Sequence, residues 1–266
     1  MSPTGEGPIA VASQARTGRR AALGVLLGVL LSGPLAVALV SATHPQPAWR
    51  DAELFARHYH SVQLLPYAGG IVLVAALIVL VASLHAGARP EQRPLTTAAL
   101  VFTAGFASFI FLNYVVQTTF VPQLARHYDP TNAALIAALS MTNPTSLAWA
   151  IEMWGWGFLG IATWLVSPVF GRSKVERAAA LTFVANGPVS VAGALGTIVR
   201  PGWVMTTAGL VAFAAWNVLL AAMATLTVLA LRRGPGTSSS DLSRPDSWSG
   251  FQRRSDQATA GKTGAA

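Results

Sequence analysis

Residues 64–86 read LLPYAGGIVLVAALIVLVASLHA, and this stretch decides the fold class. It contains no Asp, Glu, Lys or Arg. A helix needs about 20 predominantly apolar residues to cross a bilayer. Because the stretch is apolar on every face, it predicts a membrane-spanning helix and not the alternating strand of a membrane barrel.

Five further stretches have the same character. The six predicted spans cover residues 21–40, 64–86, 97–121, 147–170, 178–199 and 203–231. The composition agrees, since 53% of the 266 residues are hydrophobic and 11% are charged, whereas soluble domains carry roughly 25% charged residues. This balance excludes a soluble enzyme, a disordered protein and a disulfide-stabilised scaffold. The predicted fold class is an all-α polytopic membrane helix bundle with six transmembrane helices.

The basic residues predict how the chain is threaded. With the N-terminus in the cytoplasm, fourteen of the 18 Lys and Arg residues fall in the inside segments, which are 1–20, 87–96, 171–177 and 232–266. An excess of basic residues marks cytoplasmic loops, so both termini are expected on the inner side of the cytoplasmic membrane. The same residues favour contact with anionic lipid at that face. Because no nucleic-acid-binding module accompanies them, we expect no nucleic acid partner.

The chain divides into three parts in this interpretation. Residues 1–20 and 232–266 are expected to be disordered cytoplasmic tails, because they contain too few apolar residues to offset the entropy of ordering. Residues 21–231 form the transmembrane domain. One alternative stays open for the first span, since a basic pair followed by an apolar run that ends at Ala42 also resembles a signal peptide cleaved after that residue.

Two outer loops are expected to carry short interfacial helices. In residues 41–61, apolar and charged side chains alternate at a helical period, and in residues 122–146 an Asp-Pro start precedes an apolar run that is too short to span. Both loops contain Ala-Arg-His-Tyr, at residues 56–59 and 125–128. A duplicated two-helix unit and a chance recurrence both explain this repeat.

Groups that could carry chemistry are few. The chain has no cysteine, which excludes disulfides, thiolate metal sites and cysteine nucleophiles. The three histidines near the outer helices, His58, His60 and His127, match no metal-ligand spacing. The sequence contains no protease or nucleotide-binding signature. We therefore predict no catalytic residue, no metal and no cofactor.

Polar residues inside the spans are the strongest functional signal, because a polar group in hydrocarbon is costly unless it is paired. Glu152 is the only acid within a predicted span and lies near the outer start of residues 147–170. Asn113 and Gln117 are four residues apart near the outer end of the preceding span, so they share a helix face. Because an outer loop joins these two spans, the three residues are predicted to form one polar cluster.

A second candidate site lies deeper in the bilayer. Asn186 is followed by a glycine and by Pro188, and a proline inside a helix predicts a kink or a break. Broken helices often line binding sites near the midplane. We therefore take Asn186, Pro188 and Asn217 as a candidate midplane site. The alternative is that these amides only hold helices together, as the Gly24 and Gly28 pair is expected to do by close packing.

Two segments resemble a known group of proteins. Residues 113–117 (NYVVQ) and 143–152 (NPTSLAWAIE), followed by Gly155 and by residues 157–160 (GFLG), resemble bacterial multi-pass integral membrane proteins that have no assigned activity. The resemblance covers the middle third of the chain. It implies residence in the bacterial inner membrane and implies no substrate.

Three classes of function stay open. The first is a small-solute carrier, or a membrane partner subunit of one, without catalysis of its own. The second is an interfacial membrane enzyme that acts on lipid or prenyl substrates through His58, His60 and His127. The third is a structural or assembly protein whose helices only pack. The surroundings of Glu152, Asn113 and Gln117 distinguish these classes.

Overall fold

The computed structural model describes residues 8–232, with side chains from residue 13 onward, and every regular element in this range is helical. The long helices are α1 (Pro8–Ser32), α2 (Pro34–Thr43), α4 (Leu65–Ala86), α5 (Arg93–Val115), α8 (Leu147–Val166), α9 (Lys174–Val199) and α10 (Thr207–Arg232). The short helices are α3 (Ala52–Arg57), α6 (Val121–Arg126) and α7 (Ala133–Leu139). Residues 233–266 of the predicted C-terminal tail lie outside the described residues.

Five helical stretches are long and apolar enough to cross a membrane. They are Ser13–Thr43, Ser61–Ala86, Pro90–Arg126, Lys174–Val199 and Thr207–Arg232. α8 is not among them although it has 20 residues, because its tryptophans, its glycines and Glu152 lower its mean hydropathy. The all-helical class is therefore confirmed, and the five apolar helices indicate a membrane protein.

Six of the long helices of the described region contact one another in a closed order. α1 packs against α4 and α10, α4 packs against α5, α5 against α8, α8 against α9, and α9 against α10. Apart from the contact between α1 and α10, these neighbours follow one another along the chain, as short connections favour. Their inward side chains form the main core. The largest of them include Phe106, Phe183, Leu77, Leu80 and Ile110.

The start of α1 differs from the prediction of a disordered segment over residues 1–20. Residues 8–20 are helical. This end of α1 is fixed to α4, because Nε2 of Gln14 donates a hydrogen bond of 2.8 Å to the carbonyl oxygen of Ser83. The hydrophobic pattern does not reveal this contact, because Gln14 is polar.

The apolar run of the first span is interrupted at Gly33. Its backbone angles, φ −100° and ψ −107°, are not helical, and they separate α1 from α2. Pro34 follows at the first position of α2, where the N–H that proline lacks is not needed by the helix. The glycine and the proline together therefore divide one apolar run into two helices.

Of the kink or break predicted at Pro188, the break does not occur. α9 runs through Pro188 as one helix from Lys174 to Val199, and the proline itself is exposed. The preceding Gly187 packs closely on α8, since a Cβ added there would lie 3.3 Å from the carbonyl oxygen of Gly160. Membrane helices often tolerate proline, and α9 does so while Gly187 beside it packs on α8.

α1 and α4 approach each other through glycines, as the small-residue pattern predicts. A Cβ added at Gly28 would lie 2.5 Å from the Cα of Leu73, and one added at Gly69 would lie 2.6 Å from the backbone of Leu31. Gly24 faces Ala76 in the same way, at 3.0 Å. Because lipid chains are as apolar as helix surfaces, the hydrophobic effect does not drive helices together inside a membrane. Close backbone packing of this kind is therefore a main source of helix association.

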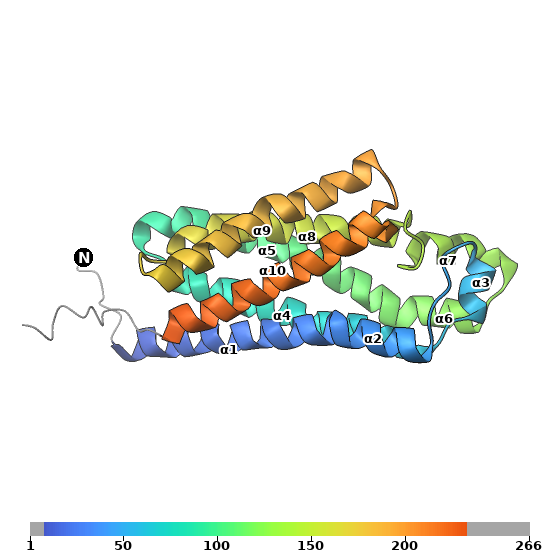
Figure 1. Cartoon of the computed structure of the whole chain (residues 1–266), viewed down its shortest axis with the longest axis horizontal. Helices are drawn as coiled ribbons and strands as arrows, with labels where there is room; N and C mark the ends of the chain where they lie inside the picture. Colours follow the sequence, from blue (N-terminus) through green and yellow to red (C-terminus); the bar gives the residue numbers. More distant parts are fainter. Residues whose placement is uncertain (1–7, 233–266) are drawn as a thin grey trace, which may run out of the picture. The chain divides into compact units, whose positions relative to one another are not determined.

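Short helices are present in both loops, residues 41–61 and 122–146, in which the sequence predicts them. α3, α6 and α7 gather at one end of the described bundle (Figure 1). They share a second, smaller core, whose buried members are Ala52, Phe55, Val121, Ala125 and Ile136. Asp51 begins α3 by accepting a hydrogen bond of 2.7 Å from the backbone N–H of Leu54, and this bond holds the pKa of Asp51 below its usual value. The cap is therefore present at neutral pH and is lost only in acid.

Candidate functional site

Glu152 of α8 is buried inside the helix bundle, with 7% of its surface exposed. Three neutral donors hold its carboxylate. Nδ2 of Asn113 donates to Oε2 over 2.8 Å, while the Tyr114 hydroxyl and Nε1 of Trp156 donate to Oε1 over 2.9 and 2.8 Å. The ion pairs of the described region join Arg50 to Asp51, Arg57 to Glu53 and Arg89 to Glu91. Glu152 is therefore a lone carboxylate among neutral groups.

Asn113 and Gln117 lie beside Glu152, as the sequence predicts. Both side chains are buried, and Nε2 of Gln117 donates to Oδ1 of Asn113 over 3.2 Å. Gln117 belongs to a π-helical segment, Val116–Phe120, that joins α5 to α6. Such segments are rare and are frequent at functional sites. The three predicted residues therefore form one connected cluster, which we call the Glu152 cluster.

The non-helical segment between α7 and α8 closes one side of the Glu152 cluster. Nε2 of Gln117 donates to the carbonyl oxygen of Leu139 over 2.7 Å, and its Oε1 accepts from the backbone N–H of Met141 over 3.3 Å. Nε1 of Trp149 donates to the carbonyl oxygen of Met141 over 2.6 Å. Side chains thus satisfy backbone groups that no helix pairs.

Asn186 forms a second cluster deeper in the bundle. It is fully buried, and its Nδ2 donates to the Thr163 hydroxyl of α8 over 3.0 Å. Its Oδ1 accepts from the Ser190 hydroxyl over 3.2 Å and from Nε1 of Trp216 over 3.1 Å. These bonds join α8, α9 and α10.

The other two residues of the predicted midplane site lie elsewhere. Pro188 is exposed. Asn217 donates to the carbonyl oxygen of Phe213 within its own helix, over 2.9 Å, and its Oδ1 faces the bend of the first span, 2.9 Å from where a Cβ of Gly33 would stand. The structure therefore does not bring Asn186, Pro188 and Asn217 together.

Two tryptophans connect the clusters of Glu152 and Asn186. Trp156 bonds to Glu152 and Trp216 bonds to Asn186. Their rings meet edge to face, with centroids 4.7 Å apart. Sequence reasoning missed Trp156, Trp216 and Tyr114. The signal for Trp156 was its position four residues after Glu152, where a helix places two side chains on one face.

Tyr114 reaches Glu152 because α4 leaves room for its ring. A Cβ added at Gly70 would lie 2.2 Å from Cε2 of Tyr114. The ring of Tyr67, also from α4, lies 5.7 Å away from that of Tyr114 between centroids. α4 therefore positions the Tyr114 hydroxyl without bonding to Glu152 itself.

The two Ala-Arg-His-Tyr motifs adopt the same local structure. Each histidine follows the last residue of a short helix and places Nδ1 near the carbonyl oxygen four residues earlier, at 2.9 Å for His58 and 3.1 Å for His127. The carbonyl oxygen of each histidine accepts from an amide five residues later, Gln63 or Asn132. The two Ala-Arg-His-Tyr motifs are therefore alike in local structure as well as in sequence.

The outer histidines serve as structural groups in this arrangement. His58 and His127 end helices α3 and α6. His60 stacks on His44, with ring centroids 3.5 Å apart, and its Nδ1 accepts from the backbone N–H of Val62 over 3.2 Å. Within residues 8–232, no group of three or more His, Asp or Glu side chains is placed to hold a metal ion.

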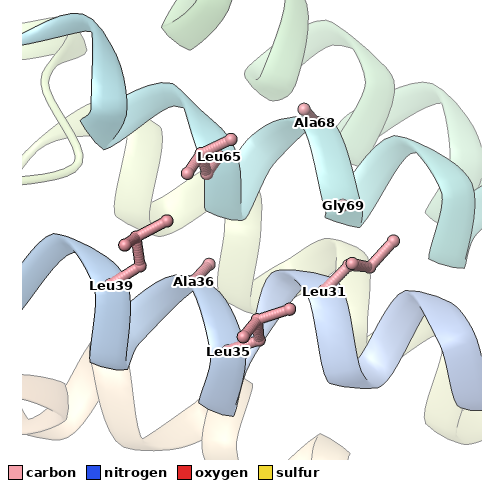
Figure 2. Close-up of a pocket in the computed structure, with 7 residues that line it drawn as sticks. All are labelled: Leu31, Leu35, Ala36, Leu39, Leu65, Ala68 and Gly69. Atoms are coloured by element: carbon pink, nitrogen blue, oxygen red, sulfur yellow. The ribbon is translucent and has the colours of Figure 1, made fainter.

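An apolar hollow of about 350 Å³ lies between α1, α2 and α4, beside the bend at Gly33. Figure 2 shows α1 and α2 on one side of it and α4 on the other. Its lining is Leu31, Leu35, Ala36, Leu39, Leu65, Ala68 and Gly69. No polar side chain belongs to this lining, so the hollow lacks the hydrogen-bonding groups that the Glu152 cluster has.

Comparisons with known proteins add no relative, since no family model, no curated protein and no solved structure matches the chain. The resemblance to bacterial multi-pass membrane proteins therefore stays a prediction. The functional argument depends on the geometry of the Glu152 cluster.

Proposed function

We propose that the protein is a six-span integral membrane protein of the bacterial cytoplasmic membrane, with α8 as its sixth crossing. α8 packs along both α5 and α9, which are each long and apolar enough to span. Its 20 residues give a length of about 30 Å at 1.5 Å per residue, the thickness of the hydrocarbon core. Its Glu152, Trp156 and Phe158 contact side chains of neighbouring helices.

In this proposal both termini lie on the cytoplasmic side. The excess of Lys and Arg in the segments 1–20, 87–96, 171–177 and 232–266 supports this orientation. The short helices α3, α6 and α7 then lie at the outer interface, and the basic inner segments contact anionic lipid.

The function that the geometry supports best is that of a small-solute carrier, or of a membrane partner subunit of one, without catalysis of its own. The observation that carries this proposal is Glu152, a buried carboxylate that only neutral donors contact. Ionisable groups at membrane depth mark solute and ion pathways, because their burial is costly without a function. Carriers also place such groups beside irregular backbone, and the Leu139 and Met141 backbone lies beside this cluster.

A purely structural or assembly role is the second candidate. The observation that favours it is that bonds of the Glu152 cluster join α5 to α8 and join Gln117 to the backbone of Leu139 and Met141. Polar side chains between membrane helices contribute roughly 0.6–2 kcal/mol per contact. The interfacial-enzyme alternative has less support, because His58 and His127 close helix ends.

Replacing Glu152 by Gln tests the carrier. Proteoliposomes containing the wild-type protein are incubated with a mixture of amino acids, sugars, nucleosides, amines and carboxylic acids, and the trapped solutes are identified by mass spectrometry. We expect the wild type to accumulate at least one solute class above empty liposomes, and Glu152→Gln to fall to the empty-liposome level because the side chain keeps its size and loses its charge.

Glu53→Gln is the matched control, because Glu53 is an exposed acid that pairs only with Arg57. It should transport like the wild type. Equal uptake by the wild type and Glu152→Gln would contradict the carrier proposal. Wild-type liposomes that trap nothing, together with a loss of stability in Glu152→Gln, would favour the structural role.

A further inference from the structure

The apolar hollow between α1, α2 and α4 lies beside the bend at Gly33 and opens to the outside of the bundle. At its floor α1 and α4 touch, since a Cβ added at Gly69 would lie 2.6 Å from the backbone of Leu31. Beyond the bend, the hollow of about 350 Å³ separates α2 from α4 (Figure 2). Leu35 and Leu39 of its lining are 49% and 42% exposed, so its mouth faces the surroundings of the protein.

Water is not expected to fill this hollow. Its lining contains no polar side chain, and cavities with apolar walls stay dry and take up apolar molecules instead. Its volume falls at the lower end of the range of small-molecule sites, about 300–1,000 Å³. In a bilayer, the apolar molecules that surround a protein are the acyl chains of lipids. Part of one acyl chain is therefore the occupant that the hollow fits.

Two histidines lie at the end of the hollow nearest the short helices. His44 follows α2, five residues after Leu39, and His60 lies five residues before Leu65, the first residue of α4. Their rings are stacked, with centroids 3.5 Å apart and planes at 7°. Nε2 of Gln63 also donates to the carbonyl oxygen of His44 over 3.4 Å. The two chain segments that border the hollow therefore meet at this His44–His60 pair.

The His44–His60 pair presents hydrogen-bond donors to the outside. Nδ1 of His60 accepts from the backbone N–H of Val62 over 3.2 Å, so Nε2 carries the hydrogen of the neutral ring. Both histidines are exposed, and the ion pairs of the described region involve neither. Two protonated imidazoles at this separation repel each other, and an anion beside them offsets the repulsion. The pair therefore suits a phosphate group, which accepts hydrogen bonds and carries negative charge.

We propose that the hollow and the His44–His60 pair together bind one anionic phospholipid, with an acyl chain between α2 and α4 and the phosphate at the imidazoles. The apolar lining leads to the polar pair in the order in which a phospholipid joins its chain to its headgroup. An anionic headgroup is favoured over a zwitterionic one, because the cationic group of the latter would lie near imidazoles that gain positive charge beside a phosphate. This site is distinct from the Glu152 cluster, and the inference does not rest on the carrier.

Lipid binding is tested on the purified full-length protein in detergent by native mass spectrometry. Dioleoylphosphatidylglycerol, which is anionic, and dioleoylphosphatidylcholine, which is zwitterionic, are added at equal concentrations. We expect a single phosphatidylglycerol to bind about tenfold more tightly than phosphatidylcholine, as hydrogen bonds to a charged group imply. It should also raise the melting temperature, because a ligand of the folded state stabilises it. Equal binding of the two lipids would overturn the anionic site.

Two variants separate the headgroup contact from the chain contact. The double variant His44→Ala, His60→Asn removes both imidazoles, while asparagine still offers the Val62 N–H an acceptor. It should lose the preference for phosphatidylglycerol and keep weak binding of both lipids. Ala68→Leu places a larger side chain in the hollow and should weaken the binding of both lipids alike. Melting without lipid verifies that each variant is folded.

Matched controls make the same changes elsewhere on the chain. His127→Asn replaces an exposed histidine of the second Ala-Arg-His-Tyr motif, and Ala214→Leu enlarges an exposed alanine of α10. Both should bind the two lipids as the wild type does. Wild-type binding by folded Ala68→Leu, or an undiminished preference in the double variant, would overturn the proposal. Because these measurements involve no transport, their failure leaves the carrier standing, and failure of solute uptake leaves the lipid site standing.

Discussion

Glu152→Ala is expected to be the most destabilising single change of a polar residue in the described region. The substitution leaves the Asn113 amide, the Tyr114 hydroxyl and the Trp156 indole N–H without their acceptor. A buried donor left unpaired costs about 1–3 kcal/mol, so we expect the free energy of unfolding to fall by about 3 kcal/mol or more. Thermal melting of the detergent-solubilised protein, followed by circular dichroism, measures the loss.

Glu53→Ala is the control for this prediction. Glu53 and Arg57 form an exposed pair one helical turn apart in α3, and exposed pairs contribute roughly 0–1 kcal/mol. The control should melt close to the wild type. Similar melting temperatures for Glu152→Ala and Glu53→Ala would show that the carboxylate does not organise its three donors.

Gly28→Ala is expected to weaken the packing between α1 and α4 severely for so small a change. The added Cβ would lie 2.5 Å from the Cα of Leu73 and 2.7 Å from its backbone nitrogen. Backbone atoms cannot rotate away as a side chain does, so the two helices must separate. Overpacking of this kind costs about 1–3 kcal/mol, and a shift of the melting curve to lower temperature measures it.

Gly105→Ala is the matched control, since it adds the same methyl group to a membrane helix. Its Cβ would meet only the ring of Phe158, at 3.2 Å from Cδ2, and an aromatic side chain can yield by a few tenths of an ångström. We expect this variant to melt within a degree or two of the wild type. If Gly105→Ala loses as much stability as Gly28→Ala, close approach at Gly28 is not what holds α1 to α4.

Sequence reasoning placed the Glu152 cluster correctly because its signals are local. Asn113 and Gln117 share a face through their spacing of four residues, and one outer loop joins their span to that of Glu152. Tyr114 was missed because it directly follows Asn113. The spacing of four residues therefore does not place it on the face that Asn113 and Gln117 share. Its participation depends on space at Gly70 of α4, which is a tertiary property.

The three residues of the predicted midplane site do not lie together, and this also depends on tertiary structure. Pro188 suggested a kink or a break, but α9 is one continuous helix. Asn186 does bond to side chains of other helices. Its partners Thr163 and Trp216 could not be recognised from the sequence, because they lie on other helices and no residue spacing connects them to Asn186. The length of α1 was also underestimated. The helix extends beyond the apolar run, and Gln14 in this extension bonds to Ser83.

The central claim is that α8 crosses the membrane and holds Glu152 inside a six-span bundle. The chain has no cysteine, so single cysteines can be introduced at two exposed positions that flank α8, Thr145 and Arg172. Intact cells are treated with a membrane-impermeant maleimide. The account predicts that Thr145→Cys reacts at once and that Arg172→Cys reacts only after the membrane is permeabilised. Labelling of both positions from the same side would contradict it.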